Sequence, residues 1–195
     1  MVPGSAKLQR ETDDELIGRV RRGETRLFAE LVHRYQDPVY GMAVRFIRSP
    51  AEAEDLAQEA FLRAFRGLEG FKGDSRFSTW LYRITWNLCA DWLRRNRKPG
   101  RAPLAIDDAA DVADGTVDIE EGYLAAEERQ EVRRALDRLD EKYRSVLMLL
   151  YYQKLSYDQI ADVLDVPLKT VETRLYRARK LLGESLRRAG VGGAG

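Results

Sequence analysis

The sequence is poor in the residues from which most catalytic and metal centres are built. It has one cysteine, Cys89, and one histidine, His33, in 195 residues. A single cysteine forms no internal disulfide and supports no cysteine-rich zinc site, so we expect Cys89 to be a buried, inert thiol. The sequence also lacks a phosphate-binding G-x-x-x-x-G-K motif and a carboxylate group at metal-ligand spacing. An enzyme, a metal site and a bound cofactor are therefore not expected.

Long apolar runs and strand patterns are also lacking. No apolar run approaches the length of a membrane span, and the first ten residues lack the apolar centre of a signal peptide. We therefore expect a protein of the reducing cytoplasm. The apolar residues recur at helical spacing, and strict alternation is absent, so the expected fold class is all-α.

Charge is balanced over the whole chain but unevenly distributed. The net charge is +1. Residues 76–101 hold seven basic residues against one acid, and residues 169–190 hold seven against two. Between them, residues 102–128 hold nine acids and no Lys or Arg. Two basic segments separated by an acidic one indicate two contacts with a polyanion.

The segment 155–182 has the pattern of two helices joined by a tight turn. Ser156 and Gln159 form a capping box that begins a short helix. The residues expected on its inward face are Ile160, Ala161 and Leu164. Residues 165–167, Asp-Val-Pro, end this helix, and a second one is predicted to begin near Leu168. Its predicted apolar stripe consists of Leu168, Val171, Leu175, Ala178 and Leu182.

The second helix of this pair carries long polar side chains on its free face. Such a pair is typical of a helix-turn-helix whose second helix enters the major groove of DNA. The first half of that helix would meet base edges, and its arginines would reach phosphates. The alternative is an ordinary helical hairpin with a solvated basic face. The candidate DNA-binding residues are Lys169, Thr170, Glu172, Thr173, Arg174, Tyr176, Arg177, Arg179 and Lys180.

Three helices are predicted before residue 67. A capping box of Thr12 and Glu15 begins the first. The second is expected to bend or break at Asp37-Pro38, and Ser49-Pro50 begins the third. The third helix buries one apolar face and has many acids on the other. A protein partner for that polar face is plausible.

The helix predicted over 77–95 has two distinct faces. Its core stripe is Phe77, Leu81, Ile84, Leu88 and Trp92. The opposite side is expected to expose Tyr82 and Trp86 beside Arg83 and Asn87. Exposed aromatic rings, cations and an amide suit single-stranded bases, which stack on aromatic faces at about 1–3 kcal/mol each. The alternative is that the two aromatic residues cover another helix of the same domain.

These patterns divide the chain into two helical domains joined by a flexible acidic linker. The predicted limits are 12–97 for the first domain and 98–122 for the linker. The second domain is predicted over 123–188, followed by a disordered tail over 189–195.

Two blocks of sequence resemble the extracytoplasmic-function (ECF) sigma factors of bacterial RNA polymerase. The first covers residues 52–65 and 71–87, and the second is the helix-turn-helix segment. The resemblance implies a sigma region 2 domain that binds core polymerase and opens the minus-10 element, and a region 4 domain that reads the minus-35 element. It also implies contacts with the β′ clamp and β subunits, and an anti-sigma partner. No membrane span is expected.

The resemblance assigns roles to particular residues. Asp55, Gln58 and Glu59 would bind the β′ clamp. The recognition helix would read the minus-35 element through Glu172, Thr173, Tyr176 and Arg177. The candidate minus-10 residues, which combine the loop implied by the family with the helix after it, are Phe71, Lys72, Gly73, Asp74, Ser75, Tyr82, Arg83, Trp86 and Asn87.

Two hypotheses of different classes follow. The first is a promoter-specificity subunit that acts only with core RNA polymerase. The second is a stand-alone helix-turn-helix regulator that binds duplex operator DNA by itself. Tight, specific binding of duplex DNA by the free protein would favour the second.

Overall fold

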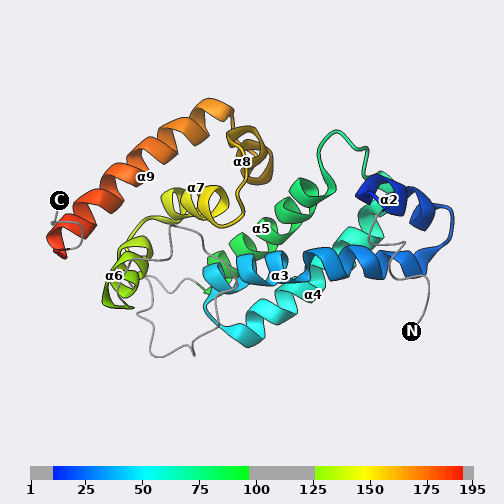
Figure 1. Ribbon diagram of the computed structural model, residues 1–195, viewed down its shortest axis with the longest axis horizontal. Coiled ribbons are helices and arrows are strands. Elements are labelled where there is room, and N and C mark those ends of the chain that lie inside the picture. The colour runs from blue at the N-terminus through cyan, green and yellow to red at the C-terminus, as the bar shows by residue number, and fades with distance from the viewer. Residues whose placement is uncertain (1–10, 97–125, 191–195) are drawn as a thin grey trace. The chain divides into compact units, whose positions relative to one another are not determined.

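The chain folds into two compact all-helical units that divide at Asn96 (Figure 1). The computed structural model describes residues 11–96 and 126–190, and this part of the chain contains no strand, as the all-α prediction requires. The predicted linker over 98–122 lies outside the described residues, and the predicted domain limits stay predictions. The first unit contains α2 (Asp13–Arg21), η1 (Thr25–Leu27), α3 (Phe28–Ile47), α4 (Pro50–Gly67), η2 (Leu68–Gly70) and α5 (Phe77–Asn96). The second contains α6 (Ala126–Asp137), α7 (Glu141–Tyr151), α8 (Tyr157–Leu164) and α9 (Leu168–Arg188).

Local capping signals begin α2 and α4 of the first unit where the sequence predicts. The Thr12 backbone N–H donates to Glu15 Oε2 at 2.7 Å, and the Glu15 N–H donates to Thr12 Oγ1 at 3.3 Å. This reciprocal pair is a complete capping box. Ser49 Oγ accepts from the Glu52 N–H at 3.5 Å, and Pro50 occupies the first position of α4.

A bend or a break was expected at Asp37-Pro38, and of these two outcomes the break is wrong. α3 runs without interruption from Phe28 to Ile47 with Pro38 inside it. Proline removes one hydrogen bond from the helical ladder, which costs stability. Leu31 lies before Pro38, and Val39 and Met42 lie after it. All three side chains are buried in the core of the first unit. Burial of one apolar face on both sides of Pro38 keeps the helix continuous.

The core of the first unit lies between α3, α4 and α5, each of which packs against the other two. α2 lies against α3 and buries Leu16, Ile17 and Val20. Phe77, the first residue of α5, is among the largest fully buried side chains and meets the rings of Phe71 and Trp80. This aromatic group fixes the start of α5 and the loop before it.

The second unit has the predicted helix-turn-helix built on α7. The capping box of α8 is present, because the Ser156 N–H donates to Gln159 Oε1 at 2.9 Å and the Gln159 N–H to Ser156 Oγ at 3.2 Å. α7 and α8 both pack against α9. Asp165 ends α8 in the left-handed conformation with φ of 54°, and Pro167 precedes α9. Aspartate tolerates this conformation better than most residues.

The buried faces of α8 and α9 differ from the predicted stripes at their edges. On α9, Val171, Leu175 and Ala178 are buried as predicted, but Leu168 is 39% exposed and Leu182 is half-buried. On α8, Ile160 and Val163 are fully buried, whereas Ala161 and Leu164 are half-buried. α9 has 21 residues and α8 has 8, so the shorter helix covers only part of the longer one.

Candidate nucleic-acid interface

The loop over residues 71–76, called the 71–76 loop below, projects between η2 and α5. Lys72, Gly73 and Asp74 are exposed, and Ser75 is half-buried. Gly73 has φ of +80°, a conformation that side chains with a Cβ rarely adopt. The polar part of the predicted minus-10 loop is therefore accessible, and its tip depends on a glycine.

Phe71 is a correction to the predicted minus-10 set. Its side chain is buried, and its ring lies 5.0 Å from the Trp80 ring and 6.0 Å from the Phe77 ring, centroid to centroid. A ring enclosed by two other rings has no free face for a base. Phe71 anchors the 71–76 loop to the core, and only its backbone lies on the loop.

Tyr82 is a second correction. It was expected to be exposed beside Trp86, but only 7% of it is exposed, and burial raises the pKa of its hydroxyl to about 12. Thr85 and Cys89, one and two turns further along the same face, are also buried. α5 packs against two helices, α3 and α4, so its buried arc is wider than the single predicted stripe.

Three of the predicted residues of α5 remain at the surface. Arg83 and Asn87 are exposed one turn apart, and Trp86 is half-buried between them along the chain. The Trp86 ring meets the Phe46 ring at 69° with centroids 5.0 Å apart, an edge-to-face arrangement. We call Arg83, Trp86 and Asn87 the α5 outer row. It offers a guanidinium, an aromatic surface and an amide within about one helical turn.

The outer face of α9 is polar and accessible, as predicted. Tyr176 is 71% exposed, and the other base-reading candidates of this helix are exposed. Thr170 and Arg174 are half-buried. The α9 outer face below means the exposed residues Lys169, Glu172, Thr173, Tyr176, Arg177 and Lys180.

Arg179 differs from its neighbours on α9 because it makes contacts within the second unit. Its Nη2 lies 3.5 Å from the Tyr157 hydroxyl of α8, and its guanidinium carbon lies 6.0 Å from the centre of the Tyr151 ring. A guanidinium near an aromatic face is attracted by the ring. Arg179 therefore links three helices and is less free than Arg177 to move toward a phosphate.

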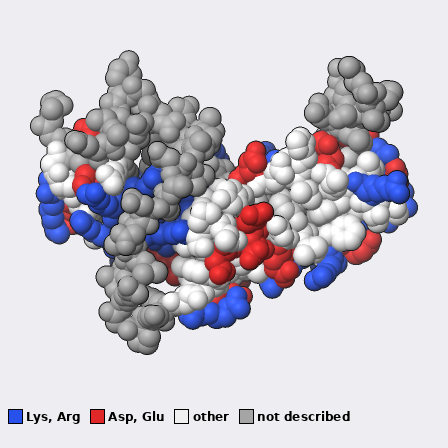
Figure 2. Space-filling model, turned by 90° about the horizontal axis from the view of Figure 1, so that it is seen from below, with Lys and Arg blue, Asp and Glu red and all other residues white. Residues whose placement is uncertain are grey.

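The polar face of α4 carries Asp55 and Gln58, both exposed, and Glu59, which is half-buried and pairs with Arg63 at 2.7 Å. Figure 2, drawn from below the view of Figure 1, shows acidic side chains gathered on the visible face of the first unit and basic side chains on the second.

Leu62 and Phe65, which the sequence reasoning missed, are 49% and 41% exposed on α4. Their spacing of four and seven residues after Gln58 places them on the same helix face and was the available signal.

Further aspects of function concern metal ligands, the single cysteine and the helix lengths in the part of the chain that the structure describes. No group of three or more His, Cys, Asp or Glu residues that could hold a metal ion occurs there. Cys89 is buried as predicted, and burial raises the pKa of its thiol to about 12, which disfavours the reactive thiolate. None of the described helices is both long and apolar enough to span a membrane.

Comparisons with known proteins match both units. The Sigma-70 region 2 family model matches residues 31–98, and the Sigma-70, region 4 model matches residues 129–182. The chain is 38% identical to the RNA polymerase sigma-H factor of Pseudomonas aeruginosa, over 92% of this chain and 96% of that one. It is 36% identical to the ECF RNA polymerase sigma factor SigW of Bacillus subtilis, over 88% and 95%.

Solved structures show the same architecture. CnrH, solved in complex with the cytosolic domain of CnrY, is similar with a TM-score of 0.66 and 28% identity, over 89% of this chain and 96% of that one. The sigma factor RpoE in complex with the anti-sigma factor NepR from Bartonella quintana has a TM-score of 0.63 at 23% identity, over 82% and 96%, a likeness of fold.

A region 2 unit followed by a region 4 unit with a helix-turn-helix defines a sigma factor of the sigma-70 class. Within that class, the chain belongs to the ECF family of RNA polymerase sigma factors. It is therefore an alternative sigma factor, and the hypothesis of a stand-alone regulator is not favoured. Its relatives are transcription factors rather than enzymes.

Proposed function

We propose that the protein recruits core RNA polymerase to promoters by two separate DNA contacts, one with each unit. The α9 outer face reads the duplex minus-35 element in the major groove. The 71–76 loop and the α5 outer row hold single-stranded bases of the minus-10 element. One observation supports this proposal. α9 in the second unit and α5 in the first each expose a polar face that suits DNA, while the apolar face of the same helix is buried.

The minus-35 contact follows from the chemistry of the α9 outer face. Arg177 can donate two hydrogen bonds to guanine, and Thr173 and Tyr176 offer hydroxyl groups to base edges or phosphates. Glu172 accepts hydrogen bonds only, so it favours the amino group of cytosine. Thr173 already donates its hydroxyl proton to the Lys169 carbonyl oxygen at 2.8 Å, so in this conformation its hydroxyl oxygen is left to accept a hydrogen bond from a base amino group.

The minus-10 contact uses binding energy to hold bases that have left the duplex. Each stacked base is worth about 1–3 kcal/mol. Extruding a base from the stack costs a few kcal/mol. Capture of bases by the α5 outer row and the 71–76 loop therefore offsets local melting without ATP.

The polymerase contact is assigned to the outer face of α4. Asp55, Gln58 and Glu59 would bind the β′ clamp, and the exposed Leu62 and Phe65 would extend that contact with apolar area. Exposed apolar side chains beside polar ones are the usual composition of a protein interface. The β subunit of core polymerase would also contact the protein, an anti-sigma partner would cover these surfaces, and the protein would act in the cytoplasm.

Transcription from a randomised promoter pool tests the proposal. The full chain with core polymerase is expected to give transcripts that core alone does not give. Asp55→Lys should reduce both polymerase binding and transcription, whereas Asp37→Lys, an exposed acid on α3, should leave both unchanged. Absence of any transcript, together with tight binding of a specific duplex by the free protein, would reject the sigma mechanism in favour of a regulator.

A further inference from the structure

Arg21, the last residue of α2, contacts the segment that leads into the 71–76 loop. Its Nε and Nη2 donate to the Leu68 carbonyl oxygen at 3.1 and 2.7 Å, and Nη2 also donates to the Phe71 carbonyl oxygen. The two acceptors lie 47 and 50 residues further along the chain. One guanidinium therefore joins both ends of the turn from which the 71–76 loop projects.

The geometry suits an arginine side chain. A guanidinium presents several N–H donors in a rigid plane, so it can bond two carbonyl oxygens at once. The Leu68 carbonyl also accepts from the Phe71 backbone N–H at 3.2 Å. The Phe71 ring beneath is held by Trp80 and Phe77. The base of the loop is thus fixed by an aromatic group on one side and Arg21 on the other.

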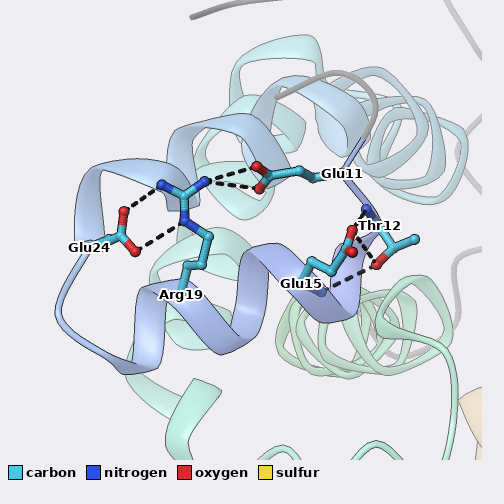
Figure 3. A network of polar contacts seen from close by, with 5 residues as sticks. All are labelled: Glu11, Thr12, Glu15, Arg19 and Glu24. Atoms are coloured by element: carbon cyan, nitrogen blue, oxygen red, sulfur yellow. Dashed lines mark hydrogen bonds and ion pairs between the residues drawn. The ribbon is translucent and has the colours of Figure 1, made fainter. Parts of the chain in front are cut away.

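α2 itself is fixed at both ends, so Arg21 is presented from a rigid element. At its start, Arg34 of α3 donates to Asp13 at 3.0 Å. Near its end, Arg19 lies between two carboxylates, donating to Glu11 at 2.9 Å and to Glu24 at 3.0 Å (Figure 3). Hydrogen bonds to Glu24 and Glu11 raise the pKa of Arg19, which stays charged.

We propose that Arg21 is a positioning residue for minus-10 recognition: it holds the base of the 71–76 loop in the conformation that accepts a single-stranded base. This rests on the proposed function of that loop. Arg21 itself touches no DNA in this role. Its effect is to reduce the number of loop conformations that must be lost on binding, which strengthens binding without a new contact.

The position of the loop can be measured without polymerase. A nitroxide on Lys72→Cys reports loop mobility in the full chain, because the native Cys89 is buried and burial disfavours its reactive thiolate. Arg21→Ala should raise the ratio of mobile to immobile label about tenfold, the ratio equivalent to about 1.4 kcal/mol. Arg21→Lys should give an intermediate ratio. Arg22→Ala, which removes an exposed charge next to it, should leave the spectrum unchanged.

Recognition is then measured with core polymerase on promoters randomised at the minus-10 element. The base read by the loop is identified as the position whose preference Asp74→Ala removes. Arg21→Ala should reduce the preference for the favoured base at that same position about tenfold, while the sequence preference at the minus-35 element stays unchanged. A general loss of folding would lower the preference at both elements, and thermal unfolding followed by circular dichroism checks the fold of each variant.

The results separate the two proposals. If the wild-type protein gives no transcript from any sequence, the proposed function fails, whatever the label shows. If the wild type reads the minus-10 element but Arg21→Ala changes neither the label nor the base preference, the positioning role is overturned. A mobile label with an unchanged base preference overturns it as well, because loop order would then not contribute to recognition.

Discussion

Trp86 offers the sharpest test of base capture, because it is the aromatic member of the α5 outer row. We expect Trp86→Ala to lower the fraction of open complexes on duplex promoters more than on promoters with a pre-melted minus-10 bubble. On the duplex, captured bases must offset the cost of melting. On the bubble, that cost is absent, so the same lost contact has less effect on occupancy.

The magnitude follows from the exposure of the ring. A freely accessible ring is worth about 1–3 kcal/mol per stacked base. Trp86 is half-buried, and part of its surface is already occupied by Phe46, so we expect the lower half of that range. A loss of about 1–2 kcal/mol corresponds to roughly a fivefold to thirtyfold decrease in open complexes.

Stability must be separated from capture, because Trp86→Ala also removes an aromatic pair worth about 0.5–1.5 kcal/mol to the fold. Trp92→Ala is the matched control. Trp92 is also half-buried on α5, but it lies at the far end of the helix and donates to Glu52 at 3.0 Å. It should lower the melting temperature by a similar amount and leave the ratio of duplex to bubble activity unchanged.

Permanganate reactivity of unpaired thymines measures opening on both templates with the same holoenzyme concentration. Asn87 is an exposed residue of the same row. Asn87→Ala should therefore lower the ratio of duplex to bubble activity, as Trp86→Ala does, without lowering the melting temperature. Equal losses on duplex and bubble templates for both Trp86→Ala and Asn87→Ala would refute base capture by this row.

Three further predictions concern other parts of the chain. Arg177→Ala should weaken the preference for one minus-35 base pair by about 1–3 kcal/mol. Arg187 lies near the end of α9, and Arg187→Ala should leave the selected sequence unchanged. A uniform loss of affinity across sequences would instead assign Arg177 to a phosphate contact. Ser156→Ala removes the cap of α8 and should lower the free energy of unfolding of the second unit by about 0.5–2 kcal/mol in denaturant titrations. Burial raises the pKa of Tyr82 from 10.0 to about 12, so the folded state binds the hydroxyl proton more tightly than the unfolded state, and the melting temperature should fall as pH rises through this window. Tyr82→Phe should reduce that fall, and an unchanged pH profile would contradict the burial.

The sequence was sufficient wherever the determining interactions are local. The capping boxes of α2 and α8 use residues three positions apart, and both are present as predicted. The start of α9 after Pro167 and its buried Val171 and Leu175 follow from helical periodicity alone. The two blocks that resemble ECF sigma factors were sufficient for the family, which the comparisons confirm.

Prediction failed where the number of packing neighbours decides the outcome. Periodicity gives the direction in which a side chain points, but not how many helices lie on that side. Tyr82 was placed at the surface because one apolar stripe was assumed for α5, whereas two helices pack against it. A bend or a break was predicted at Asp37-Pro38, but the apolar face buried on both sides of Pro38 keeps α3 continuous.

The sequence by itself therefore determined the all-helical class, the side-chain caps of α2, α4 and α8, and the polar faces of α4 and α9. Only the tertiary structure decided which aromatic rings are enclosed, and that Phe71 belongs to the core while its neighbours in the 71–76 loop face solvent. It also decided that Arg21 holds the base of that loop. The physical reason is that burial and hydrogen bonds between residues about 50 positions apart depend on how helices pack, which no local pattern specifies.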